Sequence, residues 1–243
     1  VMENPRVDYA LGCHIWPEIP EGTIGIRSGP LLAAASGFTI TIRGKGGHAA
    51  KPHLCVDALE TGCQVVGALQ RIVSRQTDPL SPTVITVGRF RAGTAANVIP
   101  ETASIGGTAR TFDMDTWHRW PEMIEPVVKG VCDSMGAGYT FTFRKGCPPT
   151  INDTDMAARI RRIAAAVVGP ERVVEPERTL GGEDMAFYLQ KARGCFFCLG
   201  AGDDGNAGLH NPRFDFNEDI MTGGVEIYCR AALELLGRTP ASV

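Results

Sequence analysis

Two histidines occupy positions from which an imidazole could bind a metal ion. His14 ends a short apolar run near the start of the chain, which predicts a strand, and a Pro-rich and Gly-rich loop is predicted after it, through Pro30. His210 closes a glycine-rich loop over residues 202–212 that follows a second apolar run. The carboxyl end of a strand is where an α/β sheet places its ligand-binding groups, and imidazole is a common metal ligand. Each histidine could instead be a structural residue whose hydrogen bonds are satisfied within the fold.

A third histidine, His48, lies in the loop Gly-Lys-Gly-Gly-His-Ala-Ala over residues 44–50. Glycines let the backbone approach a ligand closely and leave N–H groups that can bind it. The same composition occurs in loops that serve only as turns. The loop is therefore a candidate catalytic segment, and a plain turn is the alternative.

Four further polar residues sit at the ends of predicted elements. Asn97 falls between two predicted strands, and Arg110 falls near the end of the second, where a guanidinium could clamp a carboxylate. A surface ion pair would explain Arg110 equally. Glu183 and Asp184 follow a glycine pair at a predicted helix start. Helix capping accounts for one of these carboxylates, which leaves the other for a role near a metal ion or a substrate.

Residues 36–145 spell a complete set of strands and helices. Apolar and polar residues alternate from Phe38 to Ile42, as in a half-buried strand. Apolar residues at helical spacing follow the glycine-rich loop and recur over residues 117–135, which predicts two amphipathic helices. The other predicted strands lie at about 83–90, 102–111 and 139–144. The order is β-α-β-β-α-β, the split βαβ arrangement, in which both helices cover one face of a four-stranded antiparallel sheet.

The remaining segments, 1–35 and 146–243, predict parts of one α/β domain that residues 36–145 interrupt.

Composition excludes several other classes of protein. The net charge is −3 and the basic residues are scattered, so no basic stripe could follow a nucleic acid backbone. No apolar run is long enough to cross a membrane. The eight cysteines are spread singly, as structural thiols of a reducing compartment, and we expect a cytoplasmic protein.

Five segments, taken in order, resemble the metallo-aminoacylase and carboxypeptidase family, specifically its hippurate hydrolase and auxin-conjugate amidohydrolase branch. They cover nearly the whole chain and read GCHIWPEIPEGTIGIRSGP, SGFTITIRGKGGHAAKPHLCVDAL, AANVIPETASIGGTART, GGEDMAFY and GLHNPRFDF. The resemblance implies a partial Zn-peptidase-like α/β catalytic domain with an inserted α+β ferredoxin-like lid, which also forms a homodimer. The implied reaction is metal-dependent cleavage of the amide bond of N-acyl amino acids, such as hippurate, or of related small amides.

The same resemblance assigns roles to the candidate residues. It makes His14 and His210 ligands of two divalent ions, for which zinc, manganese, cobalt and nickel all suit a mixed ligand set. Glu183 and Asp184 match a motif near the metals. In the lid, His48 matches the histidine that reaches into the partner subunit's active site to polarise the scissile carbonyl. Asn97 and Arg110 match lid residues that bind the substrate, and Arg110 is assigned to its carboxylate.

One part of the family pattern has no counterpart in this sequence. The amino-terminal segment of the family carries a His-x-Cys-Gly-His-Asp motif and paired glutamates, which would supply a bridging thiolate, further metal ligands and the general base. Dinuclear hydrolysis needs such groups. We therefore expect the 243-residue chain to be an inactive or weakly active fragment of the enzyme.

Two alternatives to the enzyme remain. A non-catalytic dimerising or ligand-binding module would use the exposed edge of the lid sheet to pair with a second copy. A dinucleotide-binding oxidoreductase is disfavoured, because the loop at residues 44–50 lacks the G-x-G-x-x-G spacing and the acidic residue downstream.

Overall fold

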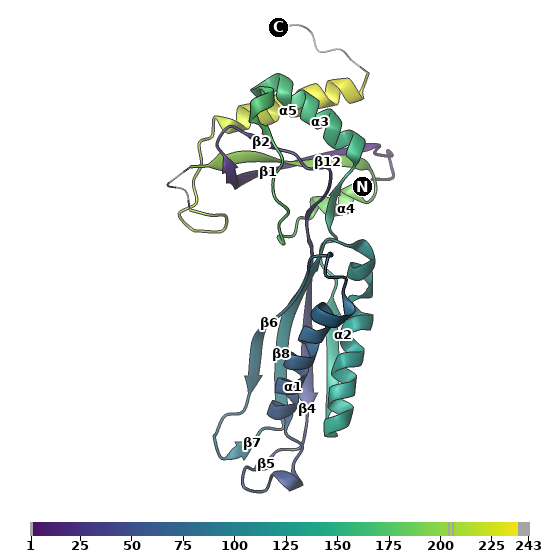
Figure 1. Ribbon diagram of the computed structural model, residues 1–243, viewed down its shortest axis with the longest axis vertical. Helices are drawn as coiled ribbons and strands as arrows, with labels where there is room; N and C mark the ends of the chain where they lie inside the picture. The colour runs from purple at the N-terminus through teal and green to yellow at the C-terminus, as the bar shows by residue number, and fades with distance from the viewer. Residues whose placement is uncertain (1, 204, 206, 238–243) are drawn as a thin grey trace. The chain divides into compact units, whose positions relative to one another are not determined.

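The computed structural model describes residues 2–203, 205 and 207–237. The chain divides into two compact units, which Figure 1 shows in the colours of the sequence. The first unit contains the described residues of 1–32, 150–179 and 184–243, and the second contains 33–149 and 180–183. The sequence predicts an insertion limited to 36–145. The second unit is slightly longer at both ends and includes the short segment 180–183.

A four-stranded mixed sheet forms the centre of the first unit, in the order β1-β12-β2-β11. The β1–β12 and β2–β11 pairs are parallel, the β12–β2 pair is antiparallel, and β3 pairs separately with β10. The elements of this unit are β1 (Tyr9–Pro20), β2 (Ile24–Gly25), β3 (Gly29–Leu32), β10 (Thr150–Asn152), α3 (Thr154–Val168), the 3₁₀ turn Pro170–Arg172, β11 (Val173–Val174), α4 (Met185–Leu189), β12 (Arg193–Gly202) and α5 (Ile220–Leu235).

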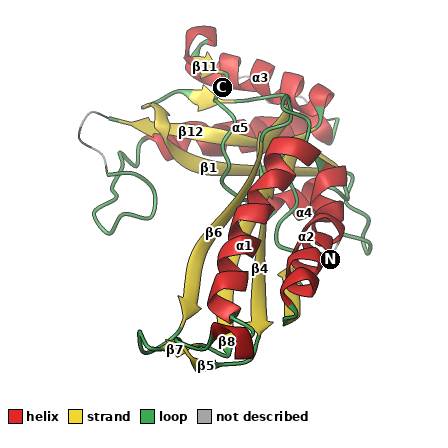
Figure 2. Ribbon diagram, turned by 60° about the horizontal axis from the view of Figure 1, so that its bottom comes forward, coloured by secondary structure: helices red, strands yellow, loops and turns green. Residues whose placement is uncertain are grey.

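Both faces of strand β12 are buried. Cys195, Phe197 and Leu199 belong to the core cluster that contains residues of α3 and α5. Phe196 and Cys198 belong to a second cluster, against which α4 packs. Figure 2 shows α3, α5 and α4 around the β1–β12 pair. A strand that is buried on both faces is typical of an α/β sheet, which is the class that the sequence predicts for this part of the chain.

Strand β1 continues beyond the point that the sequence predicts. The prediction ends this strand at His14 and places a loop after it, and this is wrong. The strand runs on to Pro20, with Trp16 opposite Gly200 of β12. Trp16 and Ile19 are buried, and that burial explains why the proline-containing segment stays extended. His14 therefore lies in the middle of a strand. Two short strands, β2 and β3, also occupy the region predicted as loop.

The second unit has the element order β-α-β-β-α-β that the sequence predicts. Its four long strands form an antiparallel sheet in the order β6-β8-β4-β9, and a two-stranded pair joins β5 and β7. The elements are β4 (Ala34–Arg43), β5 (Gly47–His48), the 3₁₀ turn Pro52–Leu54, α1 (Ala58–Arg71), the π-helical turn Ile72–Gln76, β6 (Thr83–Ala92), β7 (Val98–Ile99), β8 (Thr102–Thr111), α2 (Met114–Met135) and β9 (Gly138–Arg144).

Helices α1 and α2 cover one face of this sheet and share a single core with it. Asp57 and Asp113 begin the two helices by accepting backbone hydrogen bonds from the first turn. Gly107 of β8 is required by close packing, because a Cβ there would lie 2.3 Å from the ring of Phe38. No helix in the described part of the chain is long and apolar enough to cross a membrane.

Candidate functional site

The ring of His14 is held by two contacts on β1. Its Nδ1 lies 2.6 Å from the carbonyl oxygen of Ile15, and the ring packs edge-on against Trp16 with 5.7 Å between centroids. A carbonyl oxygen can only accept a hydrogen bond, so Nδ1 carries the proton and Nε2 of the neutral ring keeps its lone pair. Metal-binding histidines are commonly held in this way, with one nitrogen on a backbone carbonyl and the other on the metal.

The ring of His48 has the opposite arrangement. The backbone N–H of Ala50 donates to Nδ1 of His48 over 3.0 Å. Nδ1 is therefore the acceptor, and Nε2 of the neutral ring carries the proton. The residue is exposed at the end of β5, so this N–H can donate to an oxygen atom of a ligand.

The pairing of β5 with β7 brings Asn97 next to His48. His48 is opposite Val98 in the ladder, and the backbone N–H of Ala49 donates to the carbonyl oxygen of Asn97 over 3.1 Å. Asn97 is also exposed. Two predicted site residues from distant parts of the sequence thus lie side by side.

Arg110 lies near the carboxyl end of β8, opposite Ala35 of β4. One guanidinium nitrogen, Nη1, donates to the carbonyl oxygen of Leu180 over 3.3 Å. This contact fixes the guanidinium and uses one of its five N–H donors, which leaves the rest for a carboxylate. No ion pair engages Arg110 among the described residues, and this argues against the surface ion pair that the sequence left open.

Arg110 lies near one end of the four-stranded sheet, and the His48–Asn97 pair lies beyond the other end. Thr102, the first residue of β8, is opposite Arg43 at the end of β4 that leads into β5 (Figure 1). The eight steps from residue 102 to residue 110 span about 27 Å at about 3.4 Å per residue. A small ligand therefore cannot contact Arg110 and His48 of the same chain at once.

The remaining candidates are exposed or half-buried. His210 is the only residue other than glycine with a positive φ, 65°, in the described part of the chain, and it lies within the turn that the Asn211 N–H closes on the Gly208 carbonyl. Histidine tolerates this conformation better than most residues do. Asp184 precedes α4, but its side chain makes no capping hydrogen bond, so capping does not account for that carboxylate. Glu183 is half-buried beside it.

The sequence profile of peptidase family M20/M25/M40 matches residues 1–234. The chain belongs to this family. Among its relatives, an N-acetyl-L-cysteine deacetylase of Bacillus subtilis (strain 168) is 36% identical over 230 residues, which cover 95% of this chain and 54% of that protein. The IAA-amino acid hydrolase ILR1-like 2 of Arabidopsis thaliana is 35% identical over 235 residues, again covering 95% of this chain and 54% of the relative.

A solved structure of this family has the same fold. The Bacillus subtilis protein YXEP, described as a dinuclear metal binding peptidase of the M20 family, matches with a TM-score of 0.77 and 30% identity, covering 96% of this chain and 58% of YXEP. The chain thus has the α/β fold of the M20 family, with mixed sheets and helices. It spans little more than half the length of the proteins that it matches.

The metal centre of the M20 family can be compared with the donors of this chain. The lone pair on Nε2 of His14 fits a metal ligand. No group of three or more His, Cys, Asp and Glu side chains in the described ranges could hold a metal ion. Cys195 and Cys198, which form a Cys-x-x-Cys sequence, do not add to these donors. Cys195 and Cys198 lie on opposite faces of β12, and burial raises the pKa of each thiol to about 12.

Asn152 organises the first unit, and its role was not predicted from the sequence. Its side chain is buried and donates to the carbonyl oxygens of Arg27 and Phe196 over 2.8 and 2.9 Å. Its Oδ1 accepts from the backbone N–H of Phe196 over 2.6 Å. The available signal was an Asn-Asp pair directly before a predicted helix, which reads as an ordinary N-cap at Asp153.

Proposed function

We propose that this chain is part of a metal-dependent amidohydrolase that cleaves the amide bond of N-acyl amino acids. The observation that carries the proposal is the opposite protonation of two histidine rings. His14 offers a lone pair, as a metal ligand must, and His48 offers an N–H, as an oxyanion donor must. The names of two relatives support the substrate class, since one removes the acetyl group of N-acetyl-L-cysteine and the other hydrolyses IAA-amino acids.

In this proposal His14 and His210 each contribute one imidazole to a two-metal centre that other parts of the enzyme complete. Bound metal ions would polarise the scissile carbonyl and make a water molecule nucleophilic at neutral pH. Glu183 and Asp184 would lie near that centre and orient its ligands. The eight free thiols fit a reducing compartment, which supports a cytoplasmic enzyme.

The second unit would be a ferredoxin-like lid that also forms the homodimer. Nε2–H of His48 would donate to the oxyanion that develops on the scissile carbonyl, and Asn97 would hold the substrate beside it. Arg110 would bind the substrate carboxylate. Because about 27 Å separates the two ends of the sheet along β8, a small substrate that uses both His48 and Arg110 must take them from two different copies. This distance supports a dimer whose active sites are shared.

The proposal is tested by hydrolysis assays on the 243-residue chain and on the complete enzyme that contains it. With N-acetyl and N-benzoyl amino acids we expect background turnover from the chain and turnover by the complete enzyme. A chelator should abolish that turnover, and a divalent ion should restore it. A complete enzyme that turns over no N-acyl amino acid with any of zinc, manganese, cobalt or nickel would favour a dimerising or ligand-binding module.

Replacement of Arg110 by alanine tests the carboxylate contact. In the complete enzyme, we expect Arg110→Ala to raise KM for N-acyl amino acids by about tenfold or more, since a charge-assisted pair of hydrogen bonds is lost. KM for the matching N-acyl amino acid amides, which lack the carboxylate, should change little. Arg119→Ala, an exposed arginine of α2, is the control and should leave both KM values unchanged. Equal effects of Arg110→Ala on the two substrates would remove the residue from this role.

A further inference from the structure

The uncovered face of the sheet in the second unit is strongly basic. Strands β4, β6, β8 and β9 contain five arginines and no aspartate, glutamate or lysine. Residues next to these arginines, such as Ile42, Ala109 and Phe143, belong to the core beneath α1 and α2, so strand alternation places the arginines on the opposite face. They are Arg43, Arg89, Arg91, Arg110 and Arg144. The whole chain has a net charge of −3, so positive charge is concentrated on this face.

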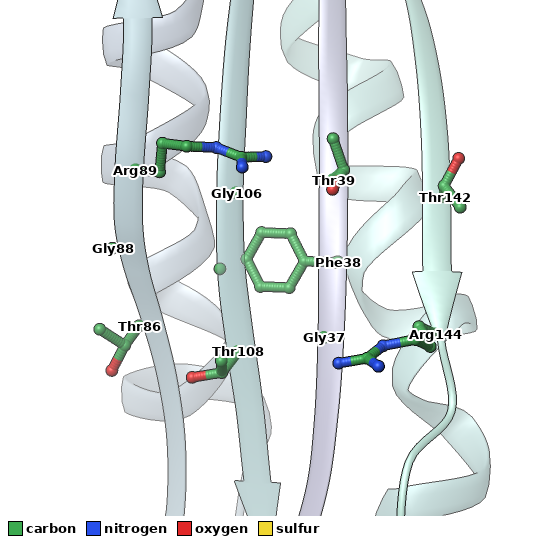
Figure 3. Close-up of a pocket in the computed structure, with 11 residues that line it drawn as sticks. Gly37, Phe38, Thr39, Thr86, Gly88, Arg89, Gly106, Thr108, Thr142 and Arg144 are labelled. Carbon is green, nitrogen blue, oxygen red and sulfur yellow. The ribbon is translucent and has the colours of Figure 1, made fainter.

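Part of this face is hollowed into a cavity of about 530 Å³, which Figure 3 shows. Its volume lies within the range of about 300–1,000 Å³ that is usual for small-molecule sites. No acidic side chain lines it, and its polar lining consists of two arginines and four threonines. These residues are Arg89, Arg144, Thr39, Thr86, Thr108 and Thr142.

A glycine lies beneath each guanidinium group, and at Gly106 the absence of a Cβ makes room for it. A Cβ on Gly106 would lie 3.0 Å from Nη2 of Arg89, and a Cβ on Gly37 would lie 4.0 Å from Nη2 of Arg144. Arg89 therefore reaches over β8 from β6, and Arg144 reaches towards β4 from β9, as Figure 3 shows. Neither guanidinium has a hydrogen bond or ion pair with the residues that the structure describes.

The register of the sheet places the two glycines on neighbouring strands. Gly106 is opposite Thr39, which is two residues from Gly37 on the same strand. Gly106 and Gly37 are therefore diagonal neighbours, about 7–8 Å apart. Arg89 and Arg144 line the same cavity, and a carboxylate or phosphate accepts charge-assisted hydrogen bonds of about 2.8 Å from a guanidinium.

We propose that this cavity binds the oxyanion group of a small organic anion, a carboxylate or a phosphate, between Arg89 and Arg144. The threonine hydroxyls supply further donors around it. The glycine-rich floor leaves space for the uncharged remainder of the ligand. The site uses no metal ion, no histidine and not Arg110, so it is independent of the proposed hydrolysis.

The site can be tested by calorimetric titration of the 243-residue chain with sodium succinate and with sodium phosphate. We expect saturable binding of at least one of them, weakened by added salt because the contact is ionic. Arg89→Gln and Arg144→Gln should each weaken binding about tenfold or more. Arg119→Gln, which removes the same charge from the surface of α2, should have no effect. Binding of succinate or of phosphate identifies the ligand as a carboxylate or a phosphate.

Two glycine variants distinguish the effect of the position of the Arg89 guanidinium on binding from the effect of its charge. Gly106→Ala keeps every charge but displaces Arg89, and it should weaken binding. Gly88 lines the same cavity, and a Cβ there would meet nothing within 4 Å. Gly88→Ala should therefore leave binding unchanged. Circular dichroism melts show that each variant is folded, and the ¹⁵Nε signals of Arg89 and Arg144 should shift on titration. Binding of neither anion, or equal losses in the arginine variants and in Arg119→Gln, would overturn the proposal.

Discussion

Mixing a His14→Ala enzyme with a His48→Ala enzyme should restore activity that neither variant has alone. In the complete enzyme, His48→Ala removes the proposed oxyanion donor and should lower kcat by about 10²–10³. His14→Ala removes the proposed metal ligand, so its homodimer should also be close to inactive. If His48 serves the partner's site, each mixed dimer has one defective site and one intact site. Random one-to-one exchange makes half of the dimers mixed, so about a quarter of wild-type activity should return.

The control is a mixture of His14→Ala with a His14→Ala/His48→Ala double variant. No dimer in that mixture has an intact metal site, so no activity should return. Subunit exchange is followed independently with differently tagged chains. If exchange is complete and the first mixture remains as inactive as its parents, His48 does not act across the dimer.

Loss of the Asn152 side chain should destabilise the first unit by about 3 kcal/mol. Asn152→Ala leaves the buried N–H of Phe196 and two carbonyl oxygens without their partner, and an unsatisfied buried polar group costs about 1–3 kcal/mol. Chemical denaturation of the 243-residue chain, followed by circular dichroism, gives the change in the free energy of unfolding.

Asn217→Ala is the matched control for this measurement. Asn217 also forms side-chain hydrogen bonds, to Glu21 and to the backbone of Asp219, but it is exposed. Water replaces these partners, so the change should stay below about 1 kcal/mol. Similar losses for the two variants would show that burial of Asn152 contributes little.

The long elements of the second unit follow from the sequence because their periodicity is local. The alternation around Phe38 and the helical spacing over residues 117–135 each report burial of one face within a single element. The two-residue strands β2, β5, β7 and β11 carry no such signal, since two residues have no period. The extension of β1 was missed for a related reason. Its prolines suggest a loop, whereas pairing with β12 and burial of Trp16 keep it extended.

The candidate residues themselves could be selected from the sequence, but their roles in the site depend on contacts. His14 and His48 look alike in the sequence, and only the partner of each Nδ1 separates an acceptor ring from a donor ring. The cavity of Arg89 and Arg144 was not predicted, because it arises where Gly106 and Gly37 are diagonal neighbours on adjacent strands. Their placement depends on the register of β8 against β4, and the sequence of a single strand does not determine that register.

The insertion of the second unit also affects how the chain folds. Strand β1 is synthesised early, and β12, its parallel partner, is synthesised only after the whole second unit. Such a non-local pairing is slow to form, because a long loop must close first. The second unit consists almost entirely of one continuous segment, so we expect it to fold before β1 pairs with β12. Its folding joins the Ala35 N–H to the Cys147 carbonyl over 2.9 Å, which ties the two ends of the insertion together and shortens the loop that remains to be closed.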